Sequence, residues 1–256
     1  MKNKQRRFFM KADPRQLLVM TGFIILFCAG CSSTESTTTT SDLPTVFQKF
    51  NSQVTISVDG DEVVIQTTDI PDHNSPYFET THSQYEAYNG TNTNYLQNPN
   101  AIAEQNFTFR IPLNPALNST HEATPLGAIG VAVNGVVFFN QYAAPGDDLS
   151  QEIDTFDQYN GHPTGGSIYH YHIQPSFLVS ELGRSALLGF LMDGFPVYGP
   201  DEDGQTLTSS DLDDYHGHSH ATSDYTDGIY HYHVTDDSPY INGDGFYGTK
   251  GTVTNI

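Results

Sequence analysis

The sequence predicts a mainly β fold, a sandwich- or barrel-like domain built from two duplicated β units with few short helices. Three observations support this prediction. Apolar runs are short, rich in β-branched and aromatic residues, and bounded by Gly, Asn, Asp and Pro. Asp-Gly or Asn-Gly separates successive runs at Asp59, Asn134 and Asp193, which is the strongest short-range signal for a hairpin. The word Tyr-His-Tyr-His occurs twice, at residues 169–172 and 230–233.

The strands are expected at the β-branched and aromatic runs, taken in chain order. These runs occupy residues 54–58, 62–68, 106–113, 128–133, 135–140, 187–192 and 251–255. The stretch SFLVSELGRSALL, residues 176–188, is the one plausible helix, and it is short.

The N-terminus reads as a secretory leader that ends in a lipidation site. Six of the ten Lys and Arg residues lie within residues 1–15, and a 14-residue apolar run, residues 17–30, follows them. Ala29-Gly30 before Cys31 resembles the lipobox of bacterial lipoproteins, although Cys28 stands where Leu is usual. The resemblance implies cleavage before Cys31, lipid on its thiol and, with Ser32 next, an outer-membrane location in the cell envelope. The alternative, a plain signal anchor, is disfavoured because about 20 residues are needed to span a bilayer.

The chain after the leader divides into a tether and one domain. Residues 31–45 are rich in Ser and Thr and carry nothing to pack. Residues 46–256 suit one domain, with internal repeats at about 126–175 and 185–240.

Charge and sulfur content narrow the function classes. After the leader the chain keeps four basic and 29 acidic residues, so its formal charge is 4 − 29 = −25. This charge argues against nucleic acid and anionic lipid as partners, and it favours solubility in salt or attraction of cations. The only cysteines are Cys28 and Cys31, and Met192 is the only methionine after the leader. A metal in the domain would therefore be held by imidazole and oxygen.

The two repeats share landmarks in one order, with offsets of 59, 56 and 61 residues. The pairs are Gly130 with Gly189, Asn134-Gly135 with Asp193-Gly194, Asp157 with Asp213, Tyr159 with Tyr215, Gly161-His162 with Gly217-His218, and the two Tyr-His-Tyr-His words. Duplication of a unit of about 45 residues explains why the Tyr-His-Tyr-His motif occurs twice.

Several motifs together resemble one family. They are IPDH at 70–73, FRIPLNP at 109–115, NGHP at 160–163, LMDGFPVYGP at 191–200 and GIYHYHVTDDSPY at 228–240. The chain resembles the YHYH-domain proteins from about Val54 to its C-terminus. The resemblance implies no particular activity. The family often carries Cys near the positions of Tyr159, Tyr215 and Phe246-Tyr247, so disulfides there would be absent from this chain.

Successive side chains along a strand point to opposite faces, so each Tyr-His-Tyr-His motif has a histidine face and a tyrosine face. Each repeat then offers two histidines from the strand and one from a Gly-His loop. The candidate ligands are His162, His170, His172, His218, His231 and His233. Three imidazoles with an open position are typical of catalytic zinc sites and also suit copper(II), iron or manganese. The alternative is structural, with Tyr and His bonding to backbone and carboxylates as a packing motif.

The sequence leaves two arrangements of these histidines open. Each repeat could hold its own ion, or the repeats could pack about a pseudo-twofold axis so that both strands face one shared site. We favour the shared or adjacent arrangement, because duplicated β units usually bury a common core.

Other polar residues are weaker candidates. His73 in IPDH is a possible further ligand, and Asp157 and Asp213 could fix the imidazole tautomers or, equally well, cap turns. Asp193 is a candidate general base, although an Asp-Gly hairpin turn explains it better. His216 and His220 surround His218 without matching the first repeat. His82 and His121 have no motif around them.

The sequence therefore predicts a cell-envelope lipoprotein whose duplicated β domain binds one or two divalent ions, copper or zinc. Catalysis is left open: zinc would favour hydrolysis by a metal-activated water, and copper oxidation or sequestration. The alternative is a non-enzymatic binding or adhesion module in which the Tyr-His-Tyr-His motif has only a structural role. Substrate and protein partners cannot be read from the sequence.

Overall fold

A computed structural model describes residues 43–256 of the chain. The expected leader (1–30), the lipidation site Cys31 and most of the expected tether (31–45) lie outside these residues. Within the described part, no helix is both long and apolar enough to cross a membrane.

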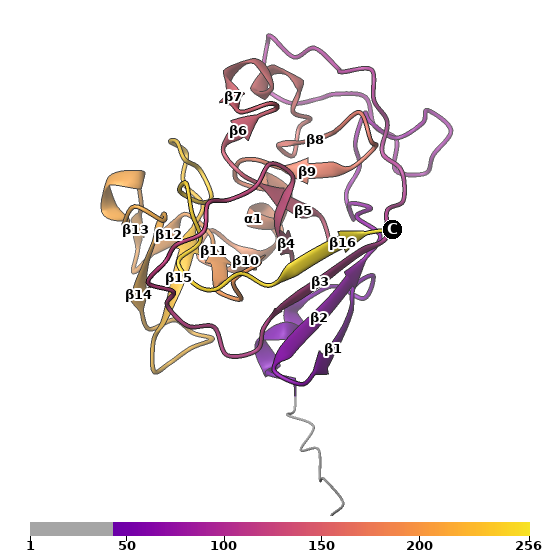
Figure 1. Ribbon diagram of the computed structural model, residues 1–256. Coiled ribbons are helices and arrows are strands. Elements are labelled where there is room, and N and C mark those ends of the chain that lie inside the picture. Colours follow the sequence, from indigo (N-terminus) through magenta and orange to yellow (C-terminus); the bar gives the residue numbers. More distant parts are fainter. Residues whose placement is uncertain (1–42) are drawn as a thin grey trace, which may run out of the picture. The chain divides into compact units, whose positions relative to one another are not determined.

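The fold is mainly β, as predicted, and its first sheet has four antiparallel strands (Figure 1). Their order is β1 (Thr55–Asp59), β2 (Glu62–Thr67), β3 (Phe107–Pro112) and β16 (Thr252–Asn255). Side chains of β3 alternate between buried and half-buried, so Phe107, Phe109 and Ile111 enter the core. The C-terminal strand thus pairs with a strand from the first half of the chain.

The second sheet has eight strands in the order β14-β15-β11-β10-β4-β5-β9-β8. The first repeat contributes β4 (Ala128–Ala132), β5 (Val137–Phe139), β8 (Gly161–Pro163) and β9 (Tyr169–Tyr171). The second contributes β10 (Leu187–Leu191), β11 (Pro196–Tyr198), β14 (Gly217–His220) and β15 (Ile229–His233). Small hairpins complete each repeat: β6 (Tyr142–Ala143) with β7 (Asp147–Asp148), and β12 (Asp201–Glu202) with β13 (Gln205–Thr206).

The eight-stranded sheet is symmetric about its centre. Strands β4 and β10 pair antiparallel there, with Val131 opposite Phe190, Gly130 opposite Leu191 and Ala132 opposite Gly189. On each side the chain turns through Asn-Gly or Asp-Gly into β5 or β11. A parallel neighbour, β9 or β15, follows, and then an antiparallel edge strand. The two repeats are therefore related by a pseudo-twofold axis through the β4–β10 pair.

Side chains of both sheets belong to one hydrophobic core, as in a β-sandwich. The 3₁₀ turn η1 (Thr45–Lys49) adds Phe47, whose ring stacks on Phe190 with centroids 4.5 Å apart. The eight-stranded sheet keeps two edges, at β8 and β14, so the barrel alternative does not apply to the described residues.

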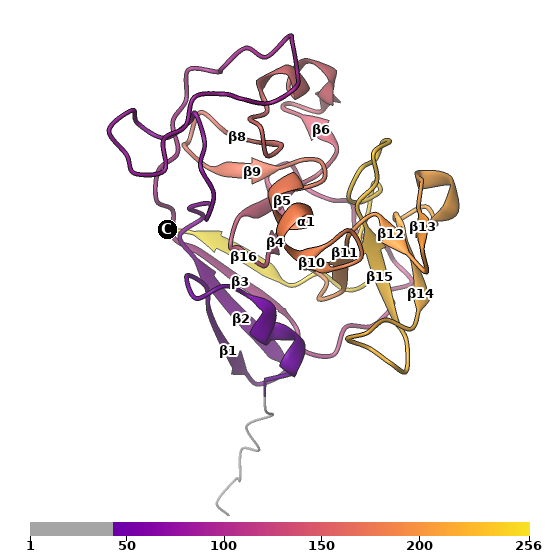
Figure 2. The same ribbon diagram turned by 180° about the vertical axis from the view of Figure 1, so that it is seen from behind.

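The helical prediction was too long. Helix α1 covers only Ser176–Leu182, against β10 (Figure 2), and ends at Gly183, whose φ of 100° breaks the helix. The following residues turn into β10 instead of continuing the helix. Three further 3₁₀ turns, η2 (Leu149–Gln151), η3 (Ile153–Thr155) and η4 (Ser209–Asp211), lie in loops.

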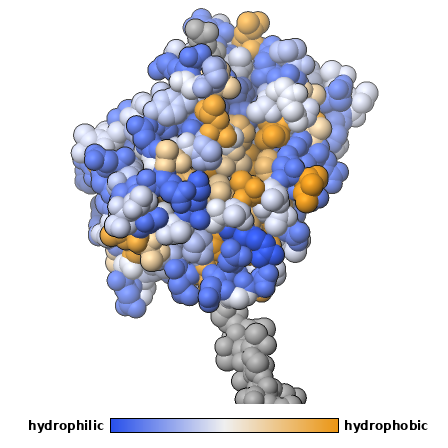
Figure 3. Space-filling model, viewed as in Figure 1, coloured by the Kyte–Doolittle hydropathy of each residue, from blue (hydrophilic) through white to orange (hydrophobic). Residues whose placement is uncertain are grey.

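The surface is mostly hydrophilic on the face shown in Figure 3, with a few hydrophobic residues gathered near its middle. Each of the four basic side chains of the described residues is ion-paired, at 2.6–2.9 Å. The pairs are Lys49 with Asp224, Arg110 with Asp59 (and with Glu62 at 3.0 Å), Arg184 with Asp201, and Lys250 with Glu122. Little positive charge is thus free for a phosphate backbone.

Candidate metal centres

The two Tyr-His-Tyr-His words form β9 and β15, and each strand pairs with the segment that carries the Gly-His motif. His162 lies opposite His170 in the β8–β9 pair, and His218 lies opposite His231 in the β14–β15 pair. The expected Gly-His loops are in fact short edge strands. This pairing explains how three histidines that are separated along each repeat reach one place.

The glycine before each of these histidines makes room for a tyrosine ring. A Cβ atom on Gly161 would collide with the ring of Tyr169, and one on Gly217 would collide with the ring of Tyr230. The Gly-His motif and the following Tyr-His-Tyr-His word are therefore one packing unit.

We call the first group of histidines the His162 cluster; it consists of His162, His170 and His172. All three side chains are at most 6% exposed. Nε2 of His170 lies 3.0 Å from Nε2 of His162 and 2.9 Å from Nε2 of His172. The three imidazoles thus converge through the same ring atom.

Hydrogen bonds on the other ring nitrogen fix the tautomers of this cluster. Nδ1 of His170 donates to the carbonyl oxygen of Ile168 at 3.1 Å, and Nδ1 of His172 donates to that of Asn140 at 2.5 Å. His162 Nδ1 lies 2.6 Å from the Thr155 hydroxyl, which donates its own proton to the carbonyl of Glu152. Because these oxygens accept, each Nδ1 carries the proton and each Nε2 presents a lone pair.

The lone pair of His170 Nε2, about 3 Å from the Nε2 atoms of His162 and His172, is repelled by both of their lone pairs unless a cation lies between them. Nitrogens bound to zinc at about 2.0–2.1 Å lie roughly 3.3 Å apart at tetrahedral angles, close to the spacing found here. The Nδ1 hydrogen bonds are also those that orient metal-bound histidines in proteins. The donor set therefore fits a divalent ion.

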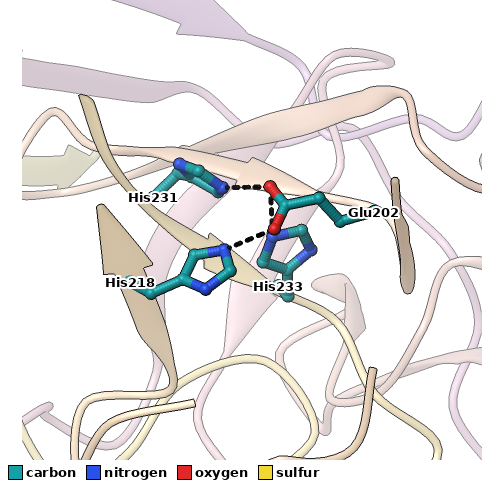
Figure 4. A group of neighbouring side chains, drawn as sticks. All are labelled: Glu202, His218, His231 and His233. Carbon is teal, nitrogen blue, oxygen red and sulfur yellow. Dashed lines mark hydrogen bonds and ion pairs between the residues drawn. The ribbon is translucent and has the colours of Figure 1, made fainter. Parts of the chain in front are cut away.

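We call the second group the Glu202 cluster; it consists of Glu202, His218, His231 and His233 (Figure 4). The Glu202 carboxylate reaches the three imidazoles from the β12–β13 hairpin. Its oxygens lie 3.0 Å from His218 Nε2, 3.1 Å from His231 Nε2 and 3.7 Å from His233 Nε2. His220 also approaches, with Nδ1 3.2 Å from Glu202, but its side chain is 44% exposed.

Two histidines of the second cluster repeat the Nδ1 hydrogen bonds of the first. Nδ1 of His231 donates to Ile229 O at 3.0 Å, and Nδ1 of His233 donates to Gly199 O at 2.7 Å. These carbonyls match Ile168 and Asn140 in the first repeat. Nε2 of His233 is buried and has no hydrogen-bond partner, which is costly for a polar atom unless a ligand fills the site.

Burial favours the neutral form of four imidazoles, two in each cluster. It lowers the pKa of His162 to about 3 and that of His233 to about 4, and it lowers the pKa values of His170 and His231. The neutral form is the one that binds a metal ion, so these four imidazoles are in the form that a ligand requires at neutral pH.

The two clusters lie far apart in the sheet, so the expectation of a shared site was wrong. Strands β5, β4, β10 and β11 separate β9 from β15 in the strand order, and Figure 1 shows the two strands on different sides of the domain. The expected pseudo-twofold axis exists, but it passes through the β4–β10 pair. The Tyr-His-Tyr-His strands, β9 and β15, lie away from this axis, each next to an edge strand of the sheet.

The tyrosines occupy the opposite face and are anchored by buried polar groups. Tyr169 and Tyr230 each donate a hydrogen bond of 2.8 Å, to Asp157 and Asp213. Both aspartates also accept backbone N–H groups of the turn that follows them, from residues 159, 161, 215 and 217. Their hydrogen bonds go to this turn and to hydroxyls, not to the imidazoles of the clusters, so the turn-capping interpretation holds.

His73 lies on the tyrosine face as well. Its Nε2 is 3.0 Å from the Tyr171 hydroxyl and its Nδ1 is 2.9 Å from Asn74 O. Its ring packs against Tyr159 and Phe177. The structure therefore does not bring His73 to either cluster.

Asp193 is part of the β10–β11 turn and is fully buried. It accepts hydrogen bonds from Tyr232 Oη at 2.6 Å, Gly248 N at 2.9 Å and Phe195 N at 3.3 Å. Burial raises its pKa to about 6. Asp193 contacts neither cluster, so its geometry supports the turn interpretation and not a general base at either histidine cluster.

The raised pKa predicts how Asp193 affects stability. A carboxyl whose pKa is raised in the folded state contributes stability below about pH 3.8, and this contribution is lost as the pH rises through 6. The loss is about 3 kcal/mol. Urea unfolding at pH 4 to 7.5 with a chelator should show a smaller fall in stability for Asp193→Asn than for wild type. The exposed Asp61→Asn is the control, and equal pH dependence in wild type and Asp193→Asn would contradict the assignment.

Sequence reasoning missed the carboxylates. Glu202 lies in the DEDG segment, which reads as a turn and does form the β12–β13 hairpin. Glu152 lies near the His162 cluster, with Oε2 3.6 Å from His162 Nε2 and 3.4 Å from His172 Nε2. At the offset of 59 residues Glu202 corresponds to Ala143, so the repeat alignment gave no signal for Glu202.

A family model described as YHYH protein matches residues 108–206 and 200–245, which together span more than half of the chain. The chain belongs to this family. The match includes every residue of both clusters and begins after IPDH, so His73 lies outside it. No curated protein and no solved structure matches the chain significantly.

Proposed function

We propose that this YHYH protein binds two divalent metal ions, copper or zinc, one in the His162 cluster and one in the Glu202 cluster. The observation that carries the proposal is the convergence of neutral imidazole Nε2 lone pairs at 2.9–3.0 Å, with Nδ1 held by oxygen acceptors. Imidazole and carboxylate donors suit both metals, and the domain after the leader has no cysteine.

The cellular setting is part of the same proposal. The leader and Cys31 would anchor the protein by lipid to the cell envelope, at the outer membrane, with the tether holding the domain in the periplasm or at the surface. Metabolic labelling with palmitate tests this, since Cys31→Ser would abolish the label in a true lipoprotein. Nucleic acid is not an expected partner, because the basic side chains are few and ion-paired.

Metal analysis of purified residues 43–256, prepared without an affinity tag or a nickel column, tests metal binding. These residues contain the whole described hydrophobic core. We expect about two equivalents of copper or zinc per chain. A protein that is empty and also refuses added copper and zinc would overturn the proposal.

The rival function is an adhesion or binding module in which the Tyr-His-Tyr-His motif has only a structural role. It explains the positions of the tyrosines but not those of the imidazoles. Tyr169, Tyr171 and Tyr232 are fully buried and hydrogen-bonded, as a packing motif requires. A purely structural motif has no use for three lone pairs directed at one point. Metal binding accounts for the histidine face of the strand, and core packing accounts for the tyrosine face.

A further inference from the structure

The two clusters differ in the number of protein donors that they offer. The His162 cluster has three imidazoles, whereas the Glu202 cluster adds a carboxylate with oxygens 3.0 and 3.1 Å from two of its imidazoles. Four protein ligands are typical of closed structural sites, and three with an open position are typical of sites that bind an external ligand.

The pseudo-twofold axis shows where this difference arises. The hairpin strand that carries Glu202 matches Tyr142–Ala143 at the offset of 59 residues, so Ala143 stands where the second repeat has Glu202. A methyl group has no donor atom. Glu152 approaches from η2–η3 instead, but its oxygen stays 3.4–3.6 Å from two imidazoles and its side chain is 31% exposed, against 17% for Glu202.

The cavity next to the His162 cluster is also larger than the one next to the Glu202 cluster. A cavity of about 340 Å³ is lined by all three imidazoles of the His162 cluster and by Glu152. Its remaining wall includes the apolar side chains of Leu126, Phe139 and Ala144. The Phe139 ring stacks on the His170 ring, with ring centroids 3.9 Å apart. The cavity beside the Glu202 cluster is about 220 Å³, and of that cluster it touches only Glu202 and His233.

We infer that the two sites have diverged. The Glu202 cluster is a closed, structural site. The His162 cluster keeps one coordination position for an external ligand with a single donor atom and an apolar body. This inference rests on the proposed metal binding and adds to it the class of ligand.

Cobalt(II) bound to single-site variants of residues 43–256 tests the inference through its visible absorption. His231→Ala with His233→Ala leaves only the His162 cluster, and His170→Ala with His172→Ala leaves only the Glu202 cluster. Imidazole and 4-phenylimidazole should both change the spectrum of the first variant, the phenyl compound binding about tenfold more tightly because its ring is buried against Leu126 and Phe139. Neither compound should change the spectrum of the second variant. If the first variant does not fold, His218→Ala with Glu202→Ala replaces it, because this change leaves only two donors, His231 and His233, at the Glu202 cluster.

A change in the cavity wall provides the matched control. Leu126→Ser should weaken 4-phenylimidazole severalfold and leave imidazole unaffected. Leu117→Ser removes a similarly exposed leucine that is not part of the cavity lining, and should change neither. Failure of both single-site variants to bind cobalt would refute the metal proposal itself. Cobalt binding with no spectral change at the His162 cluster, or with equal changes at both clusters, would refute only the divergence.

Discussion

Replacing His170 and His172 together by alanine is expected to lower the metal content from two ions per chain to one. The change removes two of the three imidazoles of the His162 cluster and leaves the Glu202 cluster, four strands away, intact. A single remaining imidazole, His162, cannot hold a divalent ion against a chelator. Metal analysis after dialysis against a weak chelator measures the loss.

The same variant should remain folded when metal-free. In the metal-free protein the three Nε2 lone pairs repel one another, so removing two imidazoles also removes an unfavourable interaction. The circular dichroism spectrum should match that of wild type. His82→Ala, which removes an exposed imidazole, is the matched control and should keep both ions. If the double variant retains two ions, the ligand assignment is wrong.

Replacing the neighbouring Tyr169 by alanine is expected to have the opposite effect, a large loss of stability. The ring is fully buried, packs over Gly161 and meets Tyr171 edge-on with centroids 5.8 Å apart. Truncation of a buried aromatic side chain costs about 3–5 kcal/mol. The free energy of unfolding in urea, measured with a chelator, gives the value.

Tyr169→Phe separates the hydroxyl from the ring. It keeps the packing and removes only the hydrogen bond to buried Asp157, which costs about 1–3 kcal/mol. An alanine variant as stable as the phenylalanine variant would show that the ring is not part of the core. Together the histidine and tyrosine changes assign metal binding to one face of β9 and folding to the other.

The sequence predicted the strands well because β-branched runs and Asp-Gly or Asn-Gly turns are local signals. Hairpins form where they were expected, at Asp59-Gly60, Asn134-Gly135 and Asp193-Gly194. The histidine and tyrosine faces followed from strand alternation alone. The edge strands β8 and β14 were missed, because Gly161–Pro163 and Gly217–His220 are short and contain Gly or Pro.

The position of the clusters depended on strand order, which no local pattern specifies. Strand β9 pairs parallel with β5 after a long crossover. Its histidines therefore lie two strands away from the central β4–β10 pair. Glu202 was missed for a related reason. Its neighbours Asp201, Asp203 and Gly204 are strong turn residues, and only the fold of the hairpin shows that the side chain reaches three distant histidines.

The seam between β4 and β10 also bears on how such a chain could have arisen. Val131 faces Phe190, its own counterpart, at the axis, whereas Gly130 faces Leu191, the counterpart of Ala132, and Ala132 faces Gly189, the counterpart of Gly130. A single ancestral unit would end in an edge strand with this self-complementary register. Two identical copies would pair along it as a homodimer and rebuild the same eight-stranded sheet, with one histidine cluster per subunit. Gene fusion would then have let one copy acquire a carboxylate that the other never needed.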